Sequence, residues 1–459
     1  MITSGKLLPL LSSTSSPLSH ITRFNCTGRS FTSTFGEQLE ACPPPPHRPP
    51  GDWNIFGALH TLDIALNFPR VNNEATDQIL RLLVAQGAHR NMDTLTLRAF
   101  HNFPFDRLAD FPAITSLGLN VSIFGFGGTT DSSQHSFAAL AAYLESKTTS
   151  MRSLHFHFAG SSFKPTLTIT PPDTAFSRAI LSCQPLQHPT SGLAALRLSG
   201  VIIERPDAFF SGLSKLRCLT SLRFDSLVNT SATQFNAALA TFLRQNNTLE
   251  RLYLAFPAGE HIMKLLPNNT RISTLSLHPL FMVKFNAALR KLVLRDVNHA
   301  TLDEFAKMNR DHAGLCSLNV GMSSTTKNTD LHLFGSIVQL IMVSATITRL
   351  KWSGFNWIQF RPLITALQGT RSVNTLKLAF SDELSVTDDE VDDHCFQDLA
   401  AQISKTMSLV LSSIDTFGEQ LQTVAFRSLF LPDLTTWKSP DRFQIGRIDA
   451  TSCTFIRNN

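Results

Sequence analysis

Residues 246–297 read NNTLERLYLAFPAGEHIMKLLPNNTRISTLSLHPLFMVKFNAALRKLVLRDV, and this stretch decides the fold. Three times within it, an apolar residue is followed three and then five positions later by two more. These apolar triplets are Leu249/Leu252/Leu254, Ile272/Leu275/Leu277 and Leu289/Leu292/Leu294. The tripeptide Asn-Asn-Thr precedes the first two triplets, at 246–248 and 268–270. The repetition predicts that one structural unit, LxxLxL with its flanks, occurs several times.

The spacing within a triplet indicates a short strand. Its last two apolar residues are two positions apart, so one face of the strand is apolar and the residues between them face the other way. The segment between strands has helical periodicity at 231–245, SATQFNAALATFLRQ, where Ser and Thr precede the helix as capping residues do. A strand and a helix that cannot bury their apolar faces alone stack on copies of themselves, so the sequence predicts a solenoid.

The triplet recurs along most of the chain. Besides the three above, we assign Leu59/Leu62/Ile64, Met92/Leu95/Leu97, Ile114/Leu117/Leu119, Met151/Leu154/Phe156, Leu193/Leu196/Leu198, Leu219/Leu222/Phe224, Leu315/Leu318/Val320, Ile347/Leu350/Trp352, Val373/Leu376/Leu378 and Leu421/Val424/Phe426. Helices are predicted at 73–88, 133–147, 174–183, 231–245, 300–310, 329–344 and 395–412. We therefore predict an α/β solenoid of about thirteen repeats over 55–430, after an N-terminal segment at 1–54 and before a C-terminal cap at 431–459.

The repeats resemble a known family. The LxxLxL strands alternating with helices, and phrases such as NAALATFLRQNNTLERLYL at 236–254, resemble ribonuclease-inhibitor-type leucine-rich repeats, particularly those of type III effectors from plant-pathogenic bacteria. The resemblance covers 55–430 and implies parallel strands on a concave face with helices on the convex face. The Asn or Cys expected three positions after each strand's last apolar residue is present at Asn67 and absent at Pro257, Leu280 and Phe355.

Basic residues are concentrated on the predicted concave face. Three positions per strand, before, between and after the last two apolar residues, give 39 positions, of which ten are basic and two, Asp63 and Asp225, are acidic. Composition alone predicts about three of each. A lining of one sign steers an oppositely charged partner, and Arg suits contacts with carboxylates or phosphates. The alternative is that Arg and Lys are ordinary residues on any exposed sheet.

The ten basic residues are Arg98, Arg197, Arg223, Arg251, Lys291, Arg295, Arg349, Lys351, Lys377 and Arg427. The predicted partner-binding residues are Arg197, Arg223, Arg251, Tyr253, Lys291, Arg295, Arg349, Lys351 and Lys377.

The N-terminal segment differs in composition from the repeats. Fourteen Ser or Thr residues precede the first acidic residue, Glu37, and a proline-rich stretch follows at 43–50. Such a segment cannot bury enough apolar surface to fold alone, so we expect it to be disordered. It resembles an organellar transit peptide or the export signal of a type III effector, and an ordinary flexible tail is the alternative.

The sequence offers no constellation for catalysis, metal or cofactor binding. Seven scattered cysteines form no CxxC pair, which argues against structural zinc or disulfides and favours a reducing compartment such as the cytoplasm. No HExxH or GxSxG motif appears, and Cys395 and His394, as neighbours on a predicted helix, do not face each other. The helix macrodipole accounts for the acidic run at 382–393. No apolar run reaches the roughly 18 residues of a membrane span, so we expect a soluble protein.

These observations predict a non-catalytic scaffold that binds an acidic protein partner through its basic concave face. The resemblance to effectors implies secretion by a bacterium into a host cell, a role in virulence and a host protein as partner. A substrate-receptor or adaptor subunit in ubiquitin ligation is the alternative function. Nucleic acid or a phosphoinositide is the alternative ligand for the basic face, and it predicts steeply salt-dependent binding.

Overall fold

The structure is a computed structural model of the full chain. It describes residues 22–27, 58–65, 84, 88–98, 105–123, 131–147, 150–160, 167–169, 192–227, 232–322, 338, 340–342, 344–355, 372–380, 422–427, 443–449 and 452–457. The chain divides into two compact units, Met1–Leu249 (unit 1) and Glu250–Asn459 (unit 2).

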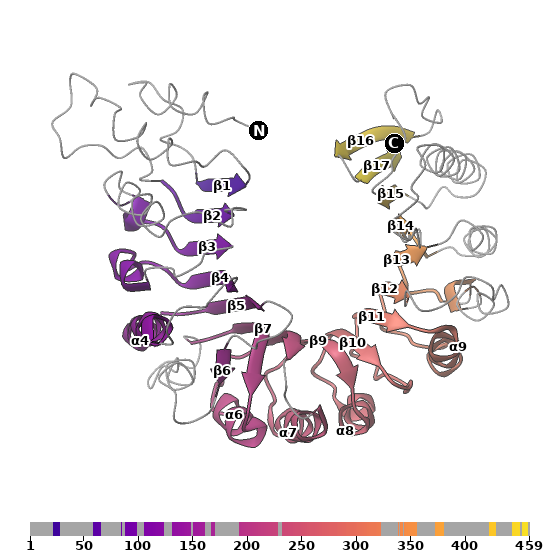
Figure 1. The fold of residues 1–459 in the computed structure, drawn as a ribbon. Helices are drawn as coiled ribbons and strands as arrows, with labels where there is room; N and C mark the ends of the chain where they lie inside the picture. Colours follow the sequence, from indigo (N-terminus) through magenta and orange to yellow (C-terminus); the bar gives the residue numbers. More distant parts are fainter. Residues whose placement is uncertain are drawn as a thin grey trace, which may run out of the picture. The chain divides into compact units, whose positions relative to one another are not determined.

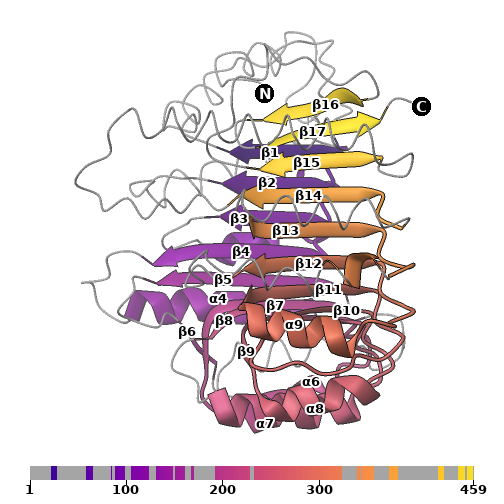
Figure 2. The same ribbon diagram turned by 90° about the vertical axis from the view of Figure 1, so that its right-hand side faces the viewer.

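Unit 1 contains a parallel sheet with helices on one side of it (Figure 1). Its strands are β1 (Arg23–Thr27), β2 (Thr61–Ala65), β3 (Thr94–Arg98), β4 (Ser116–Ile123), β5 (Ser153–Gly160), β6 (Leu167–Ile169), β7 (Ala195–Ile203) and β8 (Ser221–Leu227). Each strand pairs with the next along the chain, except that both β5 and the short β6 pair with β7. In Figure 2 the arrows of β1 to β5 point the same way. The helical elements are η2 (Ala88–Arg90), η3 (Phe105–Asp110), α4 (Asp131–Ser146), α6 (Pro206–Leu213) and α7 (Ala232–Gln245).

Unit 2 continues the same alternation and ends in a hairpin. Its parallel strands are β9 (Arg251–Ala258), β10 (Thr274–Pro279), β11 (Lys291–Val297), β12 (Ser317–Met322), β13 (Arg349–Phe355), β14 (Thr375–Phe380) and β15 (Thr423–Arg427). Its helical elements are α8 (Glu260–Leu265), η4 (Leu266–Asn268) and α9 (His299–Met308). Strands β16 (Phe443–Asp449) and β17 (Ser452–Arg457) are antiparallel, and β17 pairs antiparallel with β15. The hairpin therefore covers an edge of β15 that would otherwise expose its N–H and C=O groups. It lies within 431–459, the segment predicted to be a cap.

The apolar triplets form the core. Of their 39 residues, the 36 whose side chains are described are all at most 3% exposed. The other three, Ile64, Leu421 and Phe426, lie outside the described side chains. The predicted strands and their buried apolar triplets are therefore confirmed for the described part of the chain, and the α/β class with a long, open and mostly parallel sheet agrees with a solenoid.

Aromatic packing fixes which face of the sheet the helices cover. In unit 1 the Phe224 ring of β8 lies 5.9 Å from that of Phe210 on α6 and 5.2 Å from that of Phe235 on α7, measured between centroids. All three side chains are buried. Because side chains alternate along a strand, Arg223 and Asp225 lie on the opposite face. We call the face opposite the buried triplets the open face.

One backbone carbonyl at each step joins consecutive repeats. The Glu250 carbonyl oxygen accepts the N–H groups of Ser273 and Thr274, at 2.9 and 3.1 Å between nitrogen and oxygen. The same pair of bonds recurs at every step between consecutive triplets within each unit. Its acceptors are Thr22, His60, Asp93, Thr115, Arg152 and Ala194 in unit 1, and Glu250, Ser273, Arg290, Cys316, Thr348 and Asn374 in unit 2. The residue after the first apolar position therefore has the same role in each repeat.

Polar side chains close the turn before several triplets. Asn246 Oδ1 accepts the backbone N–H of Leu249 at 2.8 Å, and Asn269 Oδ1 accepts that of Ile272 at 3.1 Å. At the same position, three residues before the triplet, His312 Nδ1 and Ser344 Oγ accept the corresponding backbone N–H groups. The position needs a local hydrogen-bond acceptor rather than asparagine itself.

The two Asn-Asn-Thr tripeptides are not equivalent, contrary to the sequence interpretation. The turn acceptor is the first asparagine of 246–248 but the second asparagine of 268–270. The tripeptides are offset by one residue relative to the triplets that follow them. The repeated tripeptide correctly predicts a repeated structural unit. The asparagine that accepts the turn hydrogen bond, however, differs by one position between the two tripeptides.

The N-terminal segment contains a strand that the sequence analysis placed in a disordered region. Strand β1 pairs in parallel with β2, with Phe24 opposite Leu62 and Cys26 opposite Ile64. Phe and Cys at these positions do not match LxxLxL, which is why the repeat was missed. The rest of 1–54, apart from Thr22, lies outside the described residues.

Three predicted helices are confirmed, and two short ones were missed. Helices α4, α7 and α9 match the predictions at 133–147, 231–245 and 300–310 within two residues at either end. Helices α6 and α8 have eight and six residues, too few for a clear periodicity. Predicted helices 174–183 and 395–412 lie outside the described residues, as do most of 73–88 and 329–344. The acidic run at 382–393 and the pair His394 and Cys395 lie outside them too.

Gly314 makes close backbone packing possible in unit 2. A Cβ atom at this position would lie 2.1 Å from the carbonyl oxygen of Ala287, which belongs to the preceding repeat. At Gly321 of β12 a Cβ atom would have its nearest neighbour at 3.5 Å, an ordinary contact.

Substituting the two glycines tests this packing. We expect Gly314→Ala to lower the free energy of unfolding by about 1 to 3 kcal/mol, because backbone atoms must move apart. Gly321→Ala is the matched control and should cost no more than about 0.5 kcal/mol. Urea denaturation followed by circular dichroism measures both, and equal losses would contradict the packing described here.

The offset of the tripeptides gives a second prediction. Asn246→Ala and Asn269→Ala should each lower stability by about 1 kcal/mol, because two turn N–H groups lose their acceptor. The neighbouring Asn247→Ala and Asn268→Ala should stay within about 0.5 kcal/mol of the original protein. Hydrogen exchange at the amides of Leu249 and Ile272 provides a local measurement. Faster exchange in the Asn268 variant than in the Asn269 variant would refute the offset.

Candidate functional site

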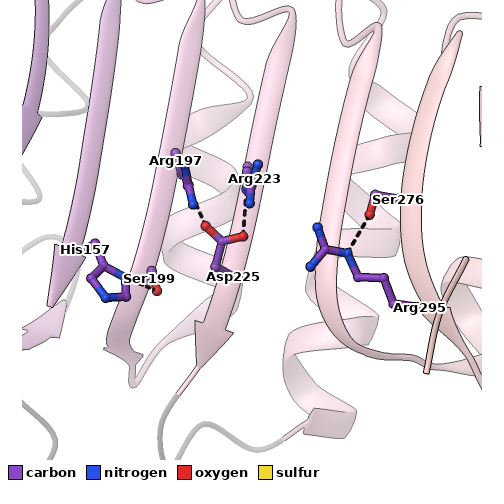
Figure 3. A network of polar contacts seen from close by, with 7 residues as sticks. All are labelled: His157, Arg197, Ser199, Arg223, Asp225, Ser276 and Arg295. Atoms are coloured by element: carbon purple, nitrogen blue, oxygen red, sulfur yellow. Dashed lines mark hydrogen bonds and ion pairs between the residues drawn. The ribbon is translucent and has the colours of Figure 1, made fainter. Parts of the chain in front are cut away.

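A carboxylate holds two arginines side by side on the open face of unit 1 (Figure 3). Arg197 of β7 and Arg223 of β8 are directly opposite in the strand register. Arg223 donates its Nε–H to Asp225 Oδ1, with 2.6 Å between the two atoms, and Arg197 donates its Nε–H to Oδ2. Both arginine side chains are about one-third exposed. We call this group the Arg-Asp-Arg bridge. Its carboxylate neutralises one of the two positive charges.

The bridge keeps its carboxylate ionised. Burial raises the pKa of Asp225, but the hydrogen bonds and the positive charges of Arg223 and Arg197 together outweigh burial, so the net pKa is lowered. Hydrogen bonds to an ionised carboxylate are stronger than those between neutral groups. At neutral pH the bridge is therefore a fixed ionic link between β7 and β8 with a net charge of +1.

Two histidines lie beside the bridge on β5. His155 is directly opposite Arg197, and His157 is opposite Ser199. Burial, followed by the positive charge of Arg197, lowers the pKa of His155 to about 4. The same two causes lower the pKa of His157. Both imidazoles are therefore neutral at physiological pH and add no charge to this face.

The histidine and serine on this face do not form a nucleophilic pair. His157 Nδ1 lies 2.7 Å from Ser199 Oγ, as Figure 3 shows, but Ser199 is only 1% exposed. A nucleophilic hydroxyl must reach the substrate, and its base is normally oriented by a third group. Asp225 directs its hydrogen bonds to the arginines. The contact between His157 and Ser199 therefore joins β5 to β7.

The open face of unit 2 carries cations on alternate strands. The residues just before the last two apolar positions of each triplet lie opposite one another across β9 to β15. In strand order this cation-hydroxyl row is Arg251, Thr274, Lys291, Ser317, Arg349, Thr375 and Thr423. Its three cations are exposed and form no hydrogen bond or ion pair with any described side chain.

A second row places two lysines next to each other. Lys351 of β13 and Lys377 of β14 are directly opposite in the register. Neighbouring strands lie about 4.8 Å apart, and like charges directly opposite one another are destabilising. The same row holds Tyr253 on β9 and Val293 on β11, which are joined in register through Ser276. This row therefore combines apolar groups at one end with positive charge at the other.

Arg295 is positioned by a buried serine. Its Nε lies 3.1 Å from Ser276 Oγ, to which it donates (Figure 3). Ser276 is 1% exposed, so the bond holds the guanidinium against the sheet. The next residue, Asp296, has a φ of 51° and places its carboxylate 3.5 Å from His278 Nε2.

The structure divides the predicted basic stripe into two parts with different chemistry. Arg197 and Arg223 belong to unit 1 and already bind Asp225. The other predicted residues, Arg251, Tyr253, Lys291, Arg295, Arg349, Lys351 and Lys377, belong to unit 2. The bridge at Asp225 was not predicted from the sequence. One signal was available, because Asp225 follows Arg223 by two positions and therefore shares its face of the strand. The side chains of Arg98 and Arg427 lie outside the described residues.

Metal binding and membrane crossing can be assessed for the described residues alone. Among them, no group of three or more His, Cys, Asp or Glu side chains could hold a metal ion. No helix in the same part of the chain is long and apolar enough to cross a membrane.

Comparisons with known proteins show a weak similarity to solved structures. No protein-family model matches the chain, and no curated protein matches it. Among solved structures, the crystal structure of the complex of Rad7 and Elc1 in yeast is similar, with a TM-score of 0.40 and 13% sequence identity. The alignment covers 70% of this chain and 87% of that chain. Similarity at this level carries no conclusion about function.

The lowered pKa of His155 predicts a loss of stability in mild acid. The folded pKa of about 4 lies below the ordinary value of 6.5, so the unfolded chain takes up a proton first as the pH falls. Stability should therefore decrease as the pH falls from about 6.5 to about 4, and His155→Gln should reduce this decrease. Urea midpoints measured at several pH values between 7 and 4 test the prediction.

The same change at exposed His261 serves as the control. A His155→Gln variant with the pH dependence of the original protein would show that His155 does not carry the effect.

Proposed function

We propose that this protein is a non-catalytic recognition scaffold that binds an acidic protein segment through the open face of unit 2. Charge is the observation that carries the proposal. The open-face positions of β9 to β14 hold six basic residues, and the one acidic side chain that the structure shows beside them is Asp296, which faces His278. A surface of one sign attracts oppositely charged partners and accelerates their association.

The helical side of unit 2 has a different charge pattern. Lys264 forms an ion pair with Glu260 on α8, and Lys307 pairs with Asp303 on α9. Cations on the helices thus have acidic partners four residues away. Those of the cation-hydroxyl row have none among the described residues, so they are available to an external anion.

The chemistry of the open face favours a protein over a purely ionic ligand. Guanidinium groups bind carboxylates through paired hydrogen bonds, as Arg251 and Arg349 could. Tyr253 supplies half-buried apolar area beside Arg251, whereas Val293 in the same row is only 9% exposed. Tyr and Arg are enriched among the residues that dominate binding energy in protein interfaces. We therefore propose an acidic protein segment as the ligand, with nucleic acid or a phosphoinositide as the rival.

The finer predictions rest on the sequence resemblance alone. They are the ribonuclease-inhibitor type of repeat, export from a plant-pathogenic bacterium and a host protein as partner. The adaptor role in ubiquitin ligation, with the solenoid as substrate receptor, stays the alternative function. Either role would use the open face in the same way, so a test of acidic-ligand binding at this face applies to both.

A charge-reversal experiment tests the proposed function. Poly-L-glutamate of about fifty residues is the probe, and fluorescence anisotropy with the full chain measures its Kd. We expect the double variant Lys291→Glu/Arg349→Glu to bind at least about ten-fold more weakly, because two attractions become repulsions. The double variant Lys284→Glu/Arg310→Glu has the same net charge and changes two exposed cations outside the open-face positions. It should change the Kd less than about two-fold.

Two results would contradict the proposal. Equal weakening in both double variants would show that net charge, and not this face, determines binding. Tighter binding of single-stranded DNA of matched length than of polyglutamate would favour the nucleic-acid alternative. Circular dichroism of each variant ensures that a loss of binding is not a loss of fold.

A further inference from the structure

The cation-hydroxyl row has a regular spacing that restricts the shape of its ligand. Arg251, Lys291 and Arg349 lie on β9, β11 and β13, and Thr274 and Ser317 occupy the strands between them. The long side chains are exposed and the short hydroxyl side chains are half-buried. The row therefore alternates projecting cations with shallow gaps.

The distance between the cations follows from sheet geometry. Paired strands lie about 4.8 Å apart, so cations on alternate strands recur about every 9.6 Å at the backbone. The three cations span four strand steps, or about 19 Å. A ligand that meets all three needs anionic groups with nearly this period.

An α-helix has such a period. Residues seven positions apart return to nearly the same face of a helix and are separated by about 10.5 Å along its axis, and fourteen positions span about 21 Å. Arg and Lys side chains are long and flexible enough to absorb a mismatch of about 1 Å per step. Residues on one face of an extended strand recur about every 6.8 Å and would miss the middle cation by about 3 Å. Duplex DNA presents a phosphate about every 3.4 Å per strand and would leave most of its charges uncompensated.

The apolar residues of the neighbouring row have the same period. Tyr253 and Val293 lie two residues further along β9 and β11 than the cations Arg251 and Lys291. Two residues along a strand are about 6.8 Å apart, which is within the roughly 10 Å diameter of a helix with its side chains. One helix lying across the strands would therefore contact both rows.

We propose that the open face of unit 2 binds an amphipathic acidic α-helix that lies across β9 to β13. Its carboxylates recur every seventh residue and meet Arg251, Lys291 and Arg349. Apolar residues beside them, at the same seven-residue period, cover the half-buried Tyr253 and the small exposed part of Val293. This inference rests on the proposed function and specifies the shape of the acidic partner.

Three synthetic peptides of about 22 residues test the proposal. The first is an alanine- and glutamine-based helix. It has glutamates at the fourth, eleventh and eighteenth positions and leucines at the seventh and fourteenth positions. The second has the same composition with glutamates five positions apart, which distributes them around the helix. The third repeats the first with two prolines that prevent helix formation. Fluorescence anisotropy with the full chain should give the first peptide at least about ten-fold lower Kd than the other two.

A variant that moves one cation by a strand separates spacing from charge. The pair of substitutions Thr274→Lys and Lys291→Thr keeps the net charge and interrupts the alternation. This variant should bind the first peptide no more tightly than the other two. Its Kd for polyglutamate should stay within about two-fold of that of the original protein. The pair Lys284→Gln and Arg310→Gln is the control and should preserve the advantage.

The outcomes show whether this inference fails alone or together with the proposed function. Equal binding of all three peptides, with polyglutamate still bound, would overturn the helix and leave the acidic-partner proposal intact. Binding of the proline peptide at least as tight as that of the first would also overturn it, in favour of an extended ligand. A moved-cation variant that retains the preference would refute the role of spacing. Failure of both the peptides and polyglutamate to bind would overturn the two proposals together.

Discussion

At the start of β1 to β5, β7 and β9 to β14, a single carbonyl oxygen accepts two backbone N–H groups from the next repeat, and the rest of the fold depends on this bond pair. The bond pair uses backbone atoms alone, so it tolerates His60, Glu250 or Cys316 at the acceptor position. It sets the register of each strand before any side chain is considered. Because a shift of one residue would turn the apolar triplets to the opposite face, this register also decides what is buried.

Sequence alone was sufficient for the features that follow from this register. Triplets with a period of two predict strands, and the buried positions agree wherever side chains are described. The sequence alone was insufficient for side-chain contacts between different repeats. The bond between Arg197 and Asp225 joins residues 28 positions apart, and their proximity follows from the pairing of β7 with β8. Strand β1 was missed because backbone pairing continues where Phe24 and Cys26 replace leucines.

The two units use similar residues for different electrostatic purposes. In unit 1 the guanidinium groups of Arg197 and Arg223 bind Asp225, and burial keeps His155 and His157 neutral beside them. In unit 2 the alternation of cations with hydroxyls separates like charges without neutralising them. Ion pairs within one face increase its rigidity, whereas unpaired cations leave a potential that reaches a ligand before contact, and more weakly as salt increases. The division could not be inferred from the count of basic residues, which treats both arrangements alike.

The Arg-Asp-Arg bridge has a consequence for how such a protein could diverge. Both arginines depend on one carboxylate for their charge balance, and that carboxylate belongs to neither the core nor the backbone register. Descendants that replaced Asp225 with a neutral residue would expose two new guanidinium groups on an unchanged scaffold. A change at this single surface position could therefore alter the binding preference of the face while the buried triplets and the backbone register stay as they are.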